Sequence, residues 1–264
     1  MDIVKQADIN LRESIKNIGE NAPKGEVIEN ENYMLTTIGL NTTESHANAV
    51  FSLDDSNPEK VFKESNDFFK KRGFDYIFWI GEARDHNMEK YLKKLGYEPS
   101  REPGTPLMVI DRRLEIPKLD IDTDLKKVES QGQINDYIDL VDECFELGEE
   151  VARDMFNSSN VLNSRNNAAY LIYYKGKAVS GVQIYRTDDV AGIYWVATRE
   201  EMRGKGLGKY ISALGTNTAF DMGVDKVILQ ASKLGKYVYD RIGYDLIGYY
   251  RTYKIEDPHP KPSI

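Results

Sequence analysis

Apolar residues recur along the chain at the spacings of helices and strands. Between residues 4 and 18 they stand three or four positions apart, which predicts an amphipathic helix. Asn57-Pro58 can begin a second helix that Gly73 ends, since proline suits the first helical turn and glycine the residue beyond the last. The elements predicted for the first half are helix 4–18, strands 31–40 and 47–53, helix 58–73, strand 75–80, helix 87–97 and strand 105–114.

The second half shows the same kinds of pattern. Three strands are predicted within 167–198, with turns at Lys175-Gly176 and at Asp188-Asp189. Gly148 is expected to break the first long helix of this half. The elements predicted are helix 133–156, three strands in 167–198, helix 206–223, strand 225–231, helix 232–244 and strand 247–255.

These elements predict an α/β fold of two domains. The polar, proline-containing segment 115–124 lacks periodicity, so we place the boundary near residue 117 and expect domains 1–117 and 118–264. A short internal similarity supports a duplication: YLKKLGY, ending at Tyr97, and VYDRIGY, ending at Tyr244, each lie between two strands. Each domain is expected to contain both strands and helices.

Composition narrows the function. The 264 residues carry a net charge of -8, which argues against general nucleic-acid binding but permits a cationic substrate. No apolar run reaches the roughly 18 residues of a membrane span. The N-terminus lacks the pattern of a secretory signal, and the single cysteine, Cys144, fits a reducing compartment. A cytoplasmic protein without nucleic-acid or membrane partners is expected.

A glycine-rich stretch, Glu200–Ile211, reads EEMRGKGLGKYI and places three glycines and three cations between Arg203 and Lys209. It lies between a predicted strand and a predicted helix, where free N–H groups and flexible glycines favour an anion. A Walker phosphate loop is excluded because Tyr210, not Ser or Thr, follows Lys209. A dinucleotide fingerprint fails because its third glycine is missing.

The stretch instead satisfies Arg/Gln-x-x-Gly-x-Gly/Ala through Arg203, Gly206 and Gly208. It resembles the acyl-CoA pyrophosphate loop of the GNAT N-acetyltransferase superfamily. A second GNAT-like element has Tyr239 four residues before Gly243-Tyr244. The resemblance covers about residues 118–255, and it implies two tandem GNAT-like domains, each with a mostly antiparallel mixed sheet flanked by helices. The first half resembles a degenerate GNAT domain that lacks the loop and has Leu92 where the second half has Tyr239.

The resemblance implies transfer of acetyl from acetyl-CoA to a primary amine of a small molecule or a protein. It assigns Tyr239 as the general acid that protonates the leaving thiolate, and the backbone N–H of Val196 as the oxyanion donor. Ser232 opens the helix that holds Tyr239, and either caps it or contacts the cofactor. The cofactor-binding residues implied are Val196, Ala197, Thr198, Arg203, Gly204, Lys205, Gly206, Leu207, Gly208, Lys209 and Ser232.

Several points stay open at this level. The strand 225–231 carries Gln230 and no carboxylate, so no general base is identified. A cluster of carboxylates in the first long helical region could hold a cation or form a solvated face: Glu143, Glu146, Glu149, Glu150 and Asp154. His46, His86 and His259 lack metal-ligand spacing, so no metal is expected.

The sequence does not identify the acceptor, and it does not distinguish acetyl-CoA from a longer acyl-CoA as the donor. It also leaves open whether the protein is a monomer or a homodimer. A non-catalytic acetyl-CoA-binding regulatory or scaffold protein is the alternative function.

Overall fold

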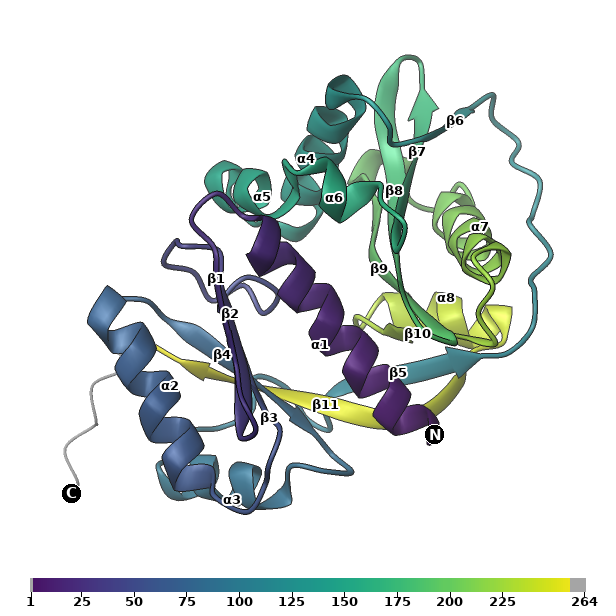
Figure 1. Ribbon diagram of the computed structural model, residues 1–264. Coiled ribbons are helices and arrows are strands. Elements are labelled where there is room, and N and C mark those ends of the chain that lie inside the picture. The colour runs from purple at the N-terminus through teal and green to yellow at the C-terminus, as the bar shows by residue number, and fades with distance from the viewer. Residues whose placement is uncertain (1, 257–264) are drawn as a thin grey trace. The chain divides into compact units, whose positions relative to one another are not determined.

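The computed structural model describes residues 2–256 and divides them into two compact units (Figure 1). The C-terminal unit consists of Pro106–Ile247 together with the chain up to Ser14. The N-terminal unit consists of Ile15–Thr105 together with the chain from Gly248 onward. Each unit is described by itself.

The C-terminal unit is built on a mixed sheet with the strand order β5-β10-β9-β8-β7-β6. Neighbouring strands are antiparallel except β9 and β10, which are parallel. The strands are β5 (Thr105–Ile110), β6 (Asp124–Lys127), β7 (Asn167–Tyr174), β8 (Lys177–Thr187), β9 (Val190–Thr198) and β10 (Lys226–Gln230). The helices are α4 (Gln131–Phe145), α5 (Glu149–Phe156), α6 (Ser159–Leu162), the 3-10 turn η1 (Glu200–Met202), α7 (Leu207–Asp221) and α8 (Gly235–Ile242).

Local signals explain the boundaries of these elements. Ser130 and Gln133 form a reciprocal capping box at the start of α4, and Gly148 separates α4 from α5 as predicted. Both predicted hairpin turns are confirmed: Lys175 and Asp188 adopt left-handed backbone conformations with φ of 50° and 45°. The hairpins align β7, β8 and β9 so that their apolar residues reach the core.

The core of the C-terminal unit lies between this sheet and helices α7 and α8. Ile193 of β9, Val227 of β10 and Ile211 of α7 belong to one buried apolar cluster. Gly215 lets α7 approach the sheet closely, because a Cβ there would stand 3.0 Å from the side chain of Val182. The packing fixes the start of α7 beside the end of β9, where the site described below is found.

The N-terminal unit repeats the plan with the strand order β1-β2-β3-β4-β11. Strands β3 and β4 are parallel and the other pairs are antiparallel. The strands are β1 (Glu26–Glu29), β2 (Tyr33–Thr37), β3 (Ala49–Ser52), β4 (Tyr76–Gly81) and β11 (Asp245–Ile255), and the helices are α2 (Pro58–Arg72) and α3 (His86–Lys94). The predicted fold class, an α/β fold in which mixed, mostly antiparallel strands are flanked by helices, is confirmed, although the eleven strands are assigned to one mixed sheet and not to two.

Each unit contains a strand from the other half of the sequence. Strand β5 pairs antiparallel with β10, and residues 250–255 of β11 pair antiparallel with β4. The first helix, α1 (Ile3–Asn21), begins in the C-terminal unit and continues into the chain of the N-terminal unit. The boundary predicted near residue 117 divides the sequence into two contiguous halves. In the structure, the chain up to Ser14 and strand β5 belong to the C-terminal unit, and the chain from Gly248 onward belongs to the N-terminal unit.

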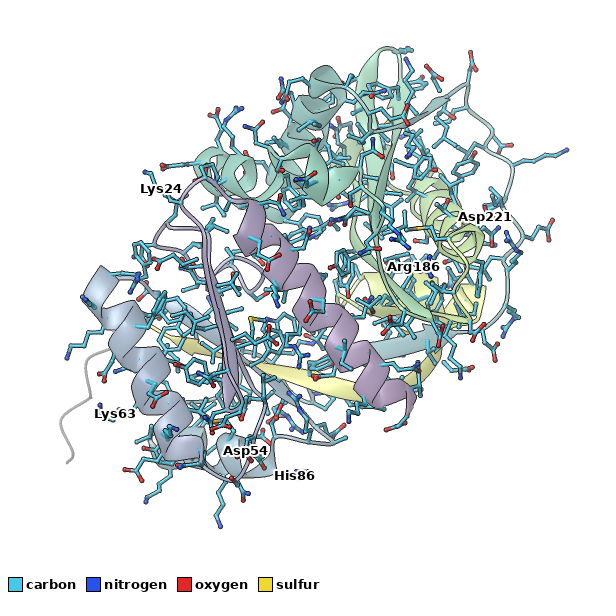
Figure 2. The ribbon with its side chains drawn as sticks, viewed as in Figure 1. Lys24, Asp54, Lys63, His86, Arg186 and Asp221 are labelled. Carbon is cyan, nitrogen blue, oxygen red and sulfur yellow. The ribbon has the colours of Figure 1, made fainter. Side chains whose placement is uncertain are left out.

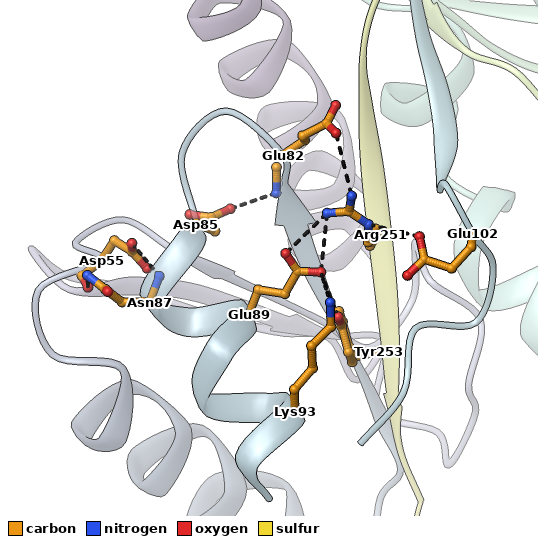
Figure 3. A network of polar contacts seen from close by, with 10 residues as sticks. Asp55, Glu82, Asp85, Asn87, Glu89, Lys93, Glu102, Arg251 and Tyr253 are labelled. Atoms are coloured by element: carbon orange, nitrogen blue, oxygen red, sulfur yellow. Dashed lines mark hydrogen bonds and ion pairs between the residues drawn. The ribbon is translucent and has the colours of Figure 1, made fainter. Parts of the chain in front are cut away.

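A cluster of charged side chains secures β11 within the N-terminal unit (Figure 3). Arg251 forms ion pairs with Glu82, Glu89 and Glu102 at 3.5, 3.1 and 3.3 Å. The hydroxyl of Tyr253 donates to Glu89 at 2.8 Å. These contacts join β11 to the residue that follows β4, to α3 and to the loop after α3.

Four short elements were not predicted: β1, β6, α6 and the three-residue turn η1. Strands β1 and β6 are edge strands with largely exposed side chains, so their sequences lack the apolar alternation that identifies a half-buried strand. Helix α6 has only four residues, too few for a helical period to be visible.

Candidate functional site

The site begins where β9 and β10 separate. These strands pair only from Val190 to Gly192 of β9, and beyond that point the facing edge of β9 is not bonded to β10. A bulge opposite Val182 lies in the same part of β9, and Trp195 within it has a φ of 51°, a conformation that costs free energy for a non-glycine residue. The separated edge leaves backbone N–H and C=O groups free to bond an extended ligand.

The glycine loop follows directly and ends at the N-terminus of α7. Gly204 and Gly206 have φ of 79° and 83°, and Gly206 is the N-cap residue without a capping side chain. A Cβ at Gly204 would meet no atom within 4 Å, so glycine is required by the backbone conformation rather than by protein packing. The first N–H groups of α7 therefore stay open, as an anion site requires.

The three loop cations have different surroundings. Arg203 lines the cleft and is anchored through its Nε, which donates to the carbonyl of Thr198 at 3.2 Å. Lys209 also lines the cleft. Lys205 donates to the carbonyl of Glu201 at 2.6 Å and is not among the residues that line it. The structure therefore brings two of the three predicted cations to the cleft.

A cleft of about 740 Å³ joins these features, within the range of small-molecule sites. It contains every residue predicted to act in catalysis or cofactor binding except Lys205. Those residues are Val196, Ala197, Thr198, Arg203, Gly204, Gly206, Leu207, Gly208, Lys209, Ser232 and Tyr239. The cavity volume, open N–H groups, unpaired strand edge and cations together fit an elongated anionic ligand such as acetyl-CoA.

Tyr239 lies on α8 and reaches the cleft from the apolar core. Its side chain is 7% exposed, and its ring meets that of Tyr244 edge to face at 5.6 Å. Burial raises the pKa of Tyr239 to about 12, while the hydroxyl of Ser212 opposes the shift. The phenol therefore stays protonated at neutral pH, so it can donate a proton but cannot accept one as a base. Leu92, its counterpart in the first half, is fully buried in the N-terminal unit.

Ser232 stands two residues before the N-cap residue of α8, which is Leu234. Its Oγ accepts the N–H of Gly235, the first residue of the helix, at 3.0 Å. The residue also lines the cleft. Gly235 must remain small, because a Cβ there would stand 3.0 Å from both Ser232 and Tyr239.

The candidate carboxylates of α4 and α5 lie outside the cleft lining. Glu143 forms an ion pair with Arg199, which is only 5% exposed and donates to the carbonyl of Ala178. Glu149 pairs with Arg153 at 3.0 Å on the surface of α5. The lining residues include no Asp, Glu or His. In residues 2–256 no group of three His, Cys, Asp or Glu could hold a metal ion, and His259 lies outside that range.

Nine residues that line the cleft were not predicted from the sequence: Cys144, Phe145, Met202, Ser212, Lys233, Leu234, Gly235, Val238 and Arg241. A helical signal could have found three of them. Leu234, Val238 and Arg241 follow one another at spacings of four and three residues, so they share the face of α8 that meets the cleft. The others come together only through the tertiary fold.

The equivalent loop of the N-terminal unit carries carboxylates instead of glycines. Asp54 (Figure 2) and Asp55 stand between β3 and α2. The carboxylate of Asp55 accepts the N–H groups of Asn87 and Met88, each at 2.8 Å, at the start of α3 (Figure 3). That of Asp54 accepts the N–H and hydroxyl of Ser56. These negative charges oppose a phosphate at this loop.

Comparison with known families agrees with the geometry of the C-terminal unit. The acetyltransferase (GNAT) family matches residues 134–244, a range that includes the separated strands, the glycine loop and Tyr239. This segment is therefore similar to the GNAT acetyltransferases. The GNAT segment lies entirely within the C-terminal unit, and no curated protein matches the chain.

Solved structures match nearly the whole chain in fold. A GCN5-related N-acetyltransferase from Kribbella flavida is 14% identical, with 93% of this chain and 95% of that one covered and a TM-score of 0.71. A conserved protein of unknown function from Staphylococcus epidermidis is 19% identical, with coverages of 92% and 97% and a TM-score of 0.63. A tandem GNAT protein from the clavulanic acid biosynthesis pathway is 11% identical, with 96% of each chain covered and a TM-score of 0.62.

At these identities the likeness establishes the fold alone, which is that of a tandem GNAT protein. Among the helices of residues 2–256, none is long and apolar enough to cross a membrane.

Proposed function

We propose that the protein is an acetyl-CoA-dependent N-acetyltransferase whose C-terminal unit binds the donor and carries out the transfer. One observation carries the proposal: the cleft joins the separated edge of β9, the open N-terminus of α7 and the protonated phenol of Tyr239. A strand edge, an anion site and a proton donor are the three groups that a direct acyl transfer from a coenzyme A thioester needs.

The residues that would hold the donor follow from this arrangement. The edge formed by Val196, Ala197 and Thr198 would bond the amides of the pantetheine arm, as an added strand would. The N–H groups at the start of α7, with Arg203 and Lys209, would hold the diphosphate. The bulge at Trp195 leaves Val196 without a partner residue on β8, so its N–H is the candidate oxyanion donor.

When bound, acetyl-CoA supplies an acetyl thioester: the acceptor nitrogen forms the new C–N bond, the C–S bond breaks and the sulfur leaves as a thiolate. Tyr239 would donate its phenolic proton to that sulfur. Its raised pKa ensures that the proton is on the oxygen at neutral pH when the thiolate forms. Water takes the surplus proton from the acceptor nitrogen and returns a proton to Tyr239. A cleft lining without a carboxylate or imidazole favours an acceptor that arrives as the neutral amine.

The same lack of a lining base is the observation that favours the second candidate, an acetyl-CoA-binding regulatory protein that does not turn over. The two candidates differ in one measurable property. An enzyme releases thiol from acetyl-CoA in the presence of its amine, whereas a binding protein does not. A screen of small primary amines and peptides, followed by thiol release, distinguishes them.

Tyr239→Phe tests the role of the phenol. The variant keeps the buried ring and removes only the donor, so we expect kcat to fall about 100-fold with little change in acetyl-CoA affinity. Tyr244→Phe is the matched control, because the Tyr244 hydroxyl bonds Thr216 in the core and does not line the cleft. Unchanged turnover in Tyr239→Phe would remove Tyr239 from the mechanism.

The stoichiometry tests which unit binds the donor. Titration calorimetry should give one acetyl-CoA per chain, because Asp54 and Asp55 occupy the corresponding loop of the N-terminal unit. Two bound cofactors per chain would contradict the assignment.

A further inference from the structure

A second cavity, of about 520 Å³, lies in the C-terminal unit between α1 and the turn that joins β8 to β9. Its volume is within the range of small-molecule sites. The residues that line it are Gln6, Ile9, Arg186, Thr187, Asp188 and Asp189. None of them lines the cleft that contains Tyr239, so this cavity is a candidate site for a different ligand.

Hydrogen bonds fix both walls of this second cavity. Asn10 of α1 donates to Thr187 Oγ1 at 2.8 Å, which holds the helix against the end of β8. The carbonyl of Asp189 accepts the N–H of Asp225 at 2.8 Å, and Asp188 adopts the φ of 45° that forms the turn. The backbone that carries the charged residues is therefore held beside the helix.

The lining combines one cation with two carboxylates, and these charges do not pair with one another. The guanidinium of Arg186 (Figure 2) donates through Nε to the carbonyl of Asp188 at 3.1 Å. Within residues 2–256 the guanidinium has no other hydrogen bond and no ion pair, and the carboxylates of Asp188 and Asp189 have no partner. The terminal nitrogens of Arg186 and both carboxylates are therefore available to a ligand.

The chemistry of the lining defines a complementary ligand. The terminal nitrogens of a guanidinium can bind a carboxylate at two points. The two aspartates suit two ammonium groups, and Ile9 offers an apolar surface on which an aliphatic stem can pack. A carboxylate, two ammonium groups and an aliphatic stem are together the parts of a diamino acid.

We propose that this cavity binds a basic amino acid of the size of lysine, with its carboxylate on Arg186 and its ammonium groups on Asp188 and Asp189. A divalent cation suits the cavity less well, because the guanidinium repels it and the lining offers only two carboxylates. The proposal does not depend on the acetyltransferase function, because the cavity shares no residue with the cleft.

Three ligands that differ in one charged group test the assignment. L-lysine carries all three groups, L-lysinamide lacks the carboxylate, and L-norleucine lacks the side-chain ammonium. Titration calorimetry of the full-length protein at about 50 mM salt should give L-lysine an affinity about fivefold or more above that of either analogue. The ratio is modest because Asp188 and Asp189 are exposed, and an exposed charge pair contributes little.

Variants locate the two contacts. Arg186→Gln should remove the preference for L-lysine over L-lysinamide and keep the preference over L-norleucine. Asp188→Asn combined with Asp189→Asn should do the reverse, and asparagine preserves the turn because it tolerates a positive φ. Arg165→Gln is the matched control, because Arg165 is an exposed arginine of the same unit that does not line the cavity.

A wild-type preference for L-lysine over both analogues, with each preference lost in its own variant, supports the proposal. No binding of L-lysine at about 10 mM, or equal binding of the three ligands by the wild type, overturns it whether or not the variants fold. An equal loss of L-lysine binding in Arg165→Gln and Arg186→Gln also overturns it, because the attraction would then be general. Titration with acetyl-CoA is measured separately, so failure here leaves the proposed function as it stands.

Discussion

The fully buried Asn10 of α1 is expected to contribute strongly to the stability of the C-terminal unit. Its Nδ2 donates to the carbonyl of Tyr185 at 3.0 Å and to Thr187 Oγ1 at 2.8 Å, and its Oδ1 accepts the hydroxyl of Tyr194 at 2.6 Å. A Cβ at Gly192 would stand 2.5 Å from Asn10 Oδ1, so strand and helix are in direct contact there. The side chain thus ties the first helix to the hairpin of β8 and β9.

The magnitude follows from counting the groups that lose a partner. Asn10→Ala leaves the Tyr185 carbonyl and the hydroxyls of Thr187 and Tyr194 without this bond, at about 1 kcal/mol or more each. The loss of unfolding free energy should therefore be about 3 kcal/mol. For a chain of this size each kcal/mol corresponds to about 2–4 °C, so Tm should fall by about 6–12 °C.

Chemical denaturation and thermal unfolding by circular dichroism measure the effect. Asn135→Ala is the matched control, because Asn135 is exposed on α4 and should change stability by less than about 0.5 kcal/mol. Tyr194→Phe removes the partner hydroxyl, and the double variant with Asn10→Ala should be more stable than the sum of the single losses by about 1 kcal/mol. A loss in Asn10→Ala no larger than in Asn135→Ala, or full additivity with Tyr194→Phe, would refute the reasoning.

Three further predictions concern the loop, the polar cluster and the cysteine. Gly206→Asp should lower acetyl-CoA affinity at least about tenfold, because it forces a side chain into a φ of 83° and adds negative charge at the anion site. Titration calorimetry measures the affinity, and unchanged binding by the folded variant would contradict the assignment of the loop. Burial alone would raise the pKa of Glu89, but contacts with Tyr253, Lys93 and Arg251 lower this pKa by more than burial raises it. The ionised Glu89 therefore stabilises the fold above the pKa of about 4.5 that it has in the unfolded chain. This stabilisation is lost as the pH falls through the pKa of Glu89 in the folded protein. Glu89→Gln should accordingly be less stable than the wild type at pH 7, with a difference that shrinks below about pH 4, and a pH-independent difference in denaturation curves would argue against this ionic role. Cys144, the single cysteine, lines the cleft, and burial raises its pKa, so alkylation is followed at about pH 9. Acetyl-CoA should slow the alkylation of the wild type but not that of Gly206→Asp. Equal alkylation rates of the wild type with and without the coenzyme would place the ligand elsewhere.

The features that the sequence determined by itself are those set by short-range physics. The start of α7 could be predicted because glycines at 204 and 206 permit positive φ next to a helix, and both lie within a few residues of one another. The position of Tyr239 could be predicted for the same reason, since its register before Gly243 is kept within a single helix and its C-cap. Long helices and buried strands show their periodicity in any one segment, so they too were accessible.

What only the tertiary structure decided depends on residues that are distant along the chain. The exchange of β5 and β11 is a choice of strand partner, and the apolar pattern of a strand states which face is buried but not which edge it joins. From the sequence, Glu143 could hold a cation from the substrate or lie on a solvated helix face, and only the fold shows that it pairs with Arg199. Lys233 and Arg241 differ from the many solvated cations of the chain only because α8 lies along the cleft. The hydrogen bonds of Asn10 join residues about 180 positions apart, and at that separation composition and spacing in the sequence carry no signal.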